Sequence, residues 1–106
     1  MRDIYYKLVR DKIPETIAAQ GDTPVTRTLD NDEYFKALNL KLQEEVAEYL
    51  DGFSVEELAD ILEVIRAIID YKGMLYDEVE EIRSAKCAVR GGFLKKIQLI
   101  EAIRKE

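Results

Sequence analysis

Four acidic residues occur as two pairs with the same spacing. Glu45 and Glu48 are three residues apart, and so are Glu57 and Asp60. On a helix, this spacing places the two Cβ atoms about 5–6 Å apart, so that each pair presents its carboxylates on one face. Carboxylates that converge in a partly dry seam repel one another and need a cation. Oxygen ligands without histidine or cysteine favour a hard ion, so the pattern indicates a Mg²⁺ or Mn²⁺ site.

The same acids have a purely structural interpretation. Glu57 stands three residues after Ser54, where it can complete a capping box, and Glu48 could pair with Lys41 or remain in solvent. The chain holds 22 Asp and Glu residues, so acidic pairs also arise without a function. Surface charge explains Glu45 least well, because this residue interrupts an otherwise apolar helical stripe.

A metal site of this kind favours phosphoanhydride chemistry. Mg²⁺ keeps several waters and commonly binds substrate phosphates beside one or two carboxylates. A bound ion also lowers the pKa of water, which yields a nucleophile without histidine, and Glu45 or Glu48 could accept the proton. The chain has no histidine, which excludes Ser-His, Cys-His and His-ligated metal mechanisms within one chain.

Phosphate groups would need basic partners in these acidic surroundings. Lys7, Arg10 and Lys12 cluster near the start, and Lys86 and Arg90 are four residues apart on one predicted helix face. Arginine binds phosphate through two parallel hydrogen bonds, and lysine acts as a point charge. For Lys86 and Arg90 an equal alternative is stabilisation of their helix C-terminus.

Three long helices must position these groups. Capping signals and apolar periodicity predict helices over about 31–51, 55–72 and 75–90, with glycines at their ends. A short helix is expected over 13–20, and residues 4–9 look extended. Short connections imply antiparallel neighbours, so the sequence predicts an all-α antiparallel bundle with an irregular N-terminal segment.

The remainder of the chain predicts packing between copies. Residues 22–29 form a loop or short strand, and the tail 93–105 forms a short strand or a last amphipathic helix. The second long helix is very apolar, with isoleucines at positions 61, 65, 68 and 69. One small layer cannot cover this surface, so we expect a homo-oligomer, a dimer or tetramer.

Composition limits the class of protein further. The 106 residues fit one domain, 1–106, with a net charge of −6, which argues against a nucleic-acid partner. No apolar run approaches the roughly 20 residues of a membrane span, so no membrane partner is expected. Cys87 is the single cysteine; it predicts a reducing, cytoplasmic setting and a small core residue.

Several motifs resemble one known superfamily. The segments EEVAE at 44–48 and EELAD at 56–60 are similar to the ExxE…ExxD signature of the MazG-like, all-α nucleoside triphosphate pyrophosphohydrolases. YKLVRDKIPE at 6–15 and KCAVRGGF at 86–93 resemble the phosphoribosyl-ATP pyrophosphohydrolase-like branch of that superfamily. The conjunction of these motifs, in this order, makes the resemblance more specific than the acidic pairs alone.

The resemblance implies hydrolysis of a nucleoside triphosphate to the monophosphate and pyrophosphate, with Mg²⁺ held by Glu45, Glu48, Glu57 and Asp60. A house-cleaning role against non-standard nucleotides is compatible with it. One alternative is a non-catalytic nucleotide-sensing or helical oligomerisation module that retains the signature. Another is a plain structural bundle, which predicts no saturable Mg²⁺ or Mn²⁺ binding.

Overall fold

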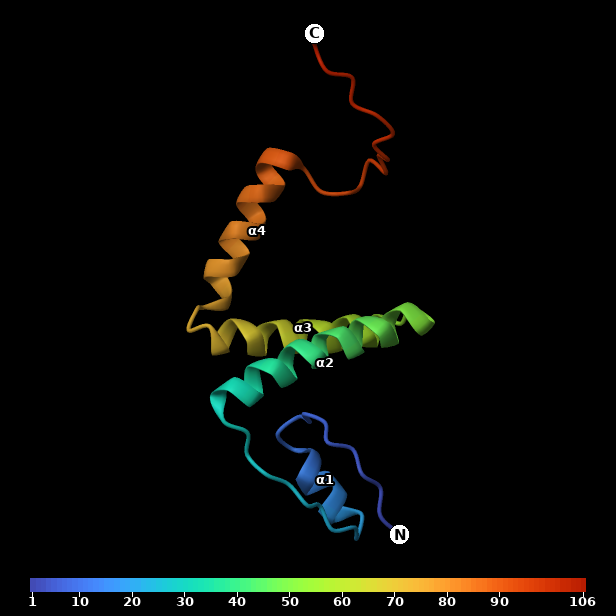
Figure 1. Ribbon diagram of the computed structural model, residues 1–106, viewed down its shortest axis with the longest axis vertical. Helices are drawn as coiled ribbons and strands as arrows, with labels where there is room; N and C mark the ends of the chain where they lie inside the picture. Colours follow the sequence, from blue (N-terminus) through green and yellow to red (C-terminus); the bar gives the residue numbers. More distant parts are fainter.

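The computed structural model describes residues 1–106 and contains only helices. They are α1 (Ile13–Ala19), α2 (Asn31–Gly52), α3 (Val55–Tyr71) and α4 (Tyr76–Arg90), arranged as in Figure 1. The all-α prediction is confirmed, and each helix differs from its predicted bounds by one residue at one end. The glycine and capping signals therefore placed the helix ends well.

A capping box formed by Asp30 and Glu33 starts α2. The Asp30 carboxylate accepts a hydrogen bond from the Glu33 amide at 2.9 Å, and the Glu33 carboxylate accepts one from the Asp30 amide at 3.2 Å. Arg27 donates to both Glu33 oxygens, at 3.2 and 2.7 Å, and lowers the pKa of Glu33 to about 2. These bonds satisfy amides that a helix start otherwise leaves unpaired.

Helices α2 and α3 form a hairpin. Only Phe53 and Ser54 separate them, and Phe53 has a left-handed φ of 59° that reverses the chain. Phe35, near the start of α2, stacks on Tyr71, the last residue of α3, with ring centroids 4.8 Å apart. The start of α2 therefore lies beside the end of α3, and the two helices run side by side in opposite directions (Figure 1).

The apolar core of the single chain lies in this hairpin and is small. Leu38, Val64 and Ile69 are its buried hydrophobic residues, with exposed fractions of 2%, 8% and 6%. Other members of the predicted stripes are half-buried or exposed, for example Leu62 at 53% and Val46 at 38%. The hairpin thus uses only part of the apolar surface that its sequence supplies.

Leu38 should contribute more to stability than any exposed leucine. We expect Leu38→Ala to lower the free energy of unfolding by about 2–4 kcal/mol, because it removes buried methyl groups and leaves a cavity. Leu40, on the same helix, is 65% exposed, so Leu40→Ala should change it by less than about 0.5 kcal/mol. Urea unfolding followed by circular dichroism measures both values. Equal losses in the two variants would contradict this core.

Helix α4 leaves the hairpin and projects away from it (Figure 1). Every residue from Glu81 to Arg90 is exposed, which makes the prediction of a buried Cys87 wrong. The reason is that the second half of α4 has no neighbouring element within the chain. Leu75, Ile82 and Val89, spaced seven residues apart on one helix face, are 69%, 51% and 85% exposed.

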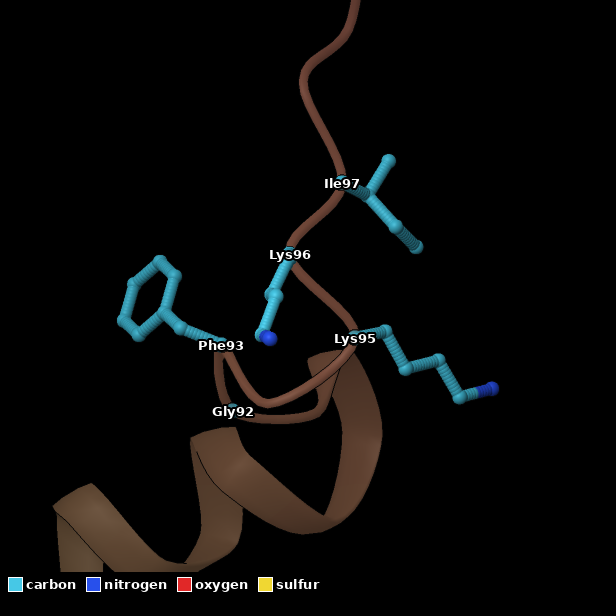
Figure 2. A pocket seen from close by; sticks show the side chains of 5 residues that line it. All are labelled: Gly92, Phe93, Lys95, Lys96 and Ile97. Atoms are coloured by element: carbon cyan, nitrogen blue, oxygen red, sulfur yellow. The ribbon is translucent and has the colours of Figure 1, made fainter.

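The tail after α4 forms neither the strand nor the helix that its sequence predicts. One turn, closed by a 3.1 Å hydrogen bond from the Lys96 amide to the Phe93 carbonyl, interrupts an irregular segment. A hollow of about 220 Å³ lies at this turn, and Figure 2 shows Phe93 and Lys95 pointing to opposite sides of it. Phe93 and Ile100 are 97% and 82% exposed. The prediction failed because no surface of the same chain covers these apolar side chains.

The chain as a whole is extended. Its radius of gyration is 19.3 Å, against about 13 Å for a compact domain of this length. The principal dimensions are 68 × 32 × 25 Å. None of the four helices combines the length and apolarity needed to cross a lipid bilayer.

Candidate functional site

The hairpin places the two acidic pairs near its closed end. Glu45 and Glu48 lie in the last turns of α2, and Glu57 and Asp60 lie in the first turns of α3. Because the connection is only two residues long, these turns are neighbours in space. The two helices that carry the predicted metal ligands are therefore neighbours within one chain.

Glu45 is the buried charged residue of the structure. It is 7% exposed, and its Oε1 atom lies 3.4 Å from the Lys41 ammonium. Its Oε2 atom is buried and has no hydrogen-bond partner. Burial raises the pKa of Glu45, the adjacent Glu48 carboxyl raises it further, and Lys41 opposes both. A carboxylate placed in this way is well suited to bind an added cation.

Glu57 provides a second unpartnered oxygen on the facing helix. Its amide donates a 3.3 Å hydrogen bond to the Ser54 hydroxyl, which is half of the expected capping box; the Glu57 carboxylate does not complete the box by accepting from the Ser54 amide. Its Oε2 atom, however, is buried without a partner. Capping therefore accounts for the backbone of Glu57 but leaves one oxygen of its carboxylate unsatisfied.

The N-terminal segment contributes two cations to the acidic face. Arg10 donates to the Asp60 carboxylate at 2.7 Å, and Lys7 donates to the Glu44 carboxylate at 3.0 Å. The Lys7 ammonium lowers the pKa of Glu44, and the Glu44 carboxylate raises the pKa of Lys7. Of the predicted phosphate ligands, Arg10 thus contacts a predicted metal ligand, Asp60, whereas Lys7 contacts Glu44, the neighbour of the predicted ligand Glu45.

Lys41 has a different partner from the one that the sequence suggested. It lies 3.7 Å from a Glu44 oxygen and 3.4 Å from a Glu45 oxygen, and it forms no ion pair with Glu48. Residues three and four apart share a helix face, whereas Lys41 and Glu48 are two turns apart. The contacts of Lys41 could therefore have been predicted from the sequence, because Lys41 precedes Glu44 by three residues and Glu45 by four.

The remaining predicted phosphate ligands lie elsewhere. Lys12 caps the start of α1, and its carbonyl oxygen accepts bonds from the Thr16 amide and hydroxyl, both at 3.1 Å. Lys86 and Arg90 lie on the exposed second half of α4, and neither forms an ion pair within the chain. Arg90 also occupies the last turn of α4, where it stabilises the helix C-terminus.

The oxygen atoms available on the acidic face are of the type that a hard divalent ion prefers. Two carboxylate oxygens, from Glu45 and Glu57, are buried without partners on adjacent helices, and the ligands available there are all oxygen. No three acidic side chains converge closely enough in the structure to form a metal-binding group. Asp60 instead faces Arg10.

A groove borders this acidic face on the side of the N-terminal segment. It measures about 290 Å³, and Tyr6, Leu8, Ala37 and Leu40 form its apolar wall. Lys7, Lys41 and Glu44 form the rest of its lining. An apolar wall beside two ammonium groups suits a ligand that carries both a flat ring and negative charge.

Part of this chain is similar to a known protein. A protein of Mycolicibacterium smegmatis (strain ATCC 700084 / mc(2)155), described only as uncharacterized, is 67% identical over 42 residues. This segment spans 40% of the present chain and 43% of the length of that relative. No family model matches the chain, and no solved structure is significantly similar to it.

Proposed function

We propose that this chain is a Mg²⁺-dependent nucleotide pyrophosphohydrolase acting on the cytoplasmic nucleotide pool. The observation that carries the proposal is the pair of buried, unpartnered carboxylate oxygens of Glu45 and Glu57 on adjacent helices. The resemblance of the acidic pairs to the MazG-like signature supports the same reaction. Glu45, Glu48, Glu57 and Asp60 would hold Mg²⁺, or Mn²⁺ in its place.

The chain's own residues have distinct parts in this reaction. Bound Mg²⁺ would offset phosphate charge and lower the pKa of a water. Glu48, exposed beside buried Glu45, would accept the proton of a water that attacks the α-phosphorus, and the anhydride bond to the leaving group would break. The leaving group is pyrophosphate. Lys7, which lines the groove, and Arg10, which lies beside Asp60, would bind phosphate oxygens.

We also infer a homo-oligomer, a dimer or tetramer, which would complete the antiparallel bundle. On α3, Val55, Leu58 and Leu62 share one helix face and are 78%, 42% and 53% exposed. The apolar face of α4 and the uncovered tail add to this surface. Apolar area of this extent on an elongated chain is typical of an interface between copies. Lys86 and Arg90 would reach a substrate only in such an assembly.

A substrate screen tests the proposed activity. Canonical, deoxy and damaged nucleoside triphosphates are incubated with the protein and Mg²⁺, and monophosphate and pyrophosphate are separated by ion-exchange chromatography. We expect equal amounts of the two products from at least one nucleotide, and none when the metal is chelated. Binding of nucleotide without turnover of any compound would instead identify a sensing module.

A further inference from the structure

The two cations of the N-terminal segment contact carboxylates of the acidic face, where a metal ion would compete with them. Arg10 contacts Asp60, which the proposed function makes a metal ligand, through a 2.7 Å ion pair across 50 residues of sequence. Lys7 contacts Glu44, the neighbour of Glu45, at 3.0 Å. Neither contact stabilises a helix, since each joins an irregular segment to the hairpin.

We propose that Arg10 is an internal counter-cation that holds Asp60 until metal and substrate bind together. This inference rests on the proposed function and adds a regulatory step to it. An ion that binds Asp60 must displace the guanidinium, so the metal alone binds weakly. A phosphate group that accepts the displaced guanidinium removes this cost. Arg10 thereby couples the two ligands.

The exposure of the ion pair suits such an exchange. The side chains of Arg10 and Asp60 are 57% and 42% exposed, so water and ligands reach both. Exposed ion pairs contribute little to stability and dissociate readily. A buried pair would resist displacement, because separation would leave each charge without a partner in a dry interior.

The groove could hold the phosphate group that would accept the displaced Arg10 guanidinium. Lys7 lines it directly, and Arg10 follows Lys7 by three residues in the same segment. A nucleotide whose ring rests on Tyr6 and Leu40 would place its phosphates near the Lys7 ammonium. Arg10 itself does not line the groove, so its guanidinium would have to leave Asp60 to reach a phosphate held at Lys7.

Metal binding without any nucleotide separates this inference from the proposed function. Mn²⁺ is titrated into the full chain, and free Mn²⁺ is measured by electron paramagnetic resonance. We expect Arg10→Gln to bind Mn²⁺ up to about fivefold more tightly than the wild type, the range that an exposed ion pair supports. Lys36→Gln, the matched control, removes one exposed charge that forms no ion pair, and it should bind Mn²⁺ as the wild type does.

Inorganic pyrophosphate provides the second measurement. At saturating Mn²⁺, Arg10→Gln should bind pyrophosphate about fivefold more weakly, because the phosphate loses a charge-assisted donor. Equal Mn²⁺ affinities of the wild type and Arg10→Gln would overturn the counter-cation while leaving the hydrolase intact. An equal gain in Lys36→Gln would also overturn it, since general charge would then explain the effect. Absence of saturable Mn²⁺ binding in every variant would overturn both proposals.

Discussion

Glu48→Gln and Asp60→Asn should each slow pyrophosphate release by at least about a hundredfold, the lower end of the range for loss of a general base. Glu48 loses the oxygen that accepts the proton, and Asp60 loses a charge that the metal requires. Both variants should fold, because both side chains are partly or largely exposed. Steady-state rates with the best substrate from the screen measure the loss.

Glu63→Gln is the matched control for this experiment. Glu63 is an exposed acid on the same helix as Asp60 and forms no ion pair. Its variant should retain the wild-type rate within about twofold, since surface charges away from a site have small effects. A comparable loss in Glu63→Gln, with circular dichroism unchanged, would show that the four carboxylates have no special part.

Glu45→Gln should stabilise the metal-free chain while it abolishes the activity. The raised pKa of Glu45 means that burial penalises its charged form. A neutral amide of the same shape removes this penalty, at the loss of the Lys41 ion pair. We expect a gain of the order of 1 kcal/mol in the free energy of unfolding at pH 7, by analogy with other unsatisfied buried groups. Urea unfolding measures the gain.

The pH dependence of this gain has a definite sign. A carboxyl whose folded-state pKa is raised binds more protons in the folded state, so stability falls as the pH rises from its ordinary pKa to its folded value. The advantage of Glu45→Gln should therefore be full above the raised pKa and vanish below about pH 4, where Glu45 is protonated in both states. If Glu45→Gln were still more stable than the wild type below about pH 4, its higher free energy of unfolding would come from packing and not from charge.

Saturating Mg²⁺ should reverse the order of the two proteins. A ligand at 100 times its dissociation constant stabilises the state that binds it by about 2.7 kcal/mol. Wild type would gain this amount, and Glu45→Gln would gain little. If Mg²⁺ stabilised neither protein, Glu45 would be a destabilising core residue without a metal.

The sequence predicted the helices because their determinants are local. Asp30 and Ser54 cap α2 and α3 as expected, and their bonds depend on residues within one turn. The predicted strand or helix over 93–105 is absent because an amphipathic segment needs a surface to pack against. The chain alone provides no such surface at Phe93 or Ile100. The prediction that Cys87 is a core residue was wrong for the same reason, since nothing in the chain packs against that part of α4.

Some features of the acidic face could be predicted from the sequence and others could not. The burial of Glu45 follows from its position among apolar residues, since a helix that buries Leu38 and half-buries Leu42 carries Glu45 into the same seam. The contact between Arg10 and Asp60 was not predictable, because no periodicity links an irregular segment to a helix 50 residues away. Of the two alternatives for Glu48, exposure to solvent is the one observed; Lys41 pairs with Glu44 and Glu45 instead, because helix neighbours are three or four residues apart.

The most direct measurement is a crystal structure with Mn²⁺, recorded at the manganese absorption edge. An anomalous peak should lie between α2 and α3, with oxygens of Glu45, Glu48, Glu57 and Asp60 around it, at the 2.0–2.2 Å or so typical of small divalent ions. Arg10 should have left Asp60 in that structure. A crystal with no peak there, and with the four carboxylates directed apart into solvent, would contradict the metal site and the hydrolase built on it.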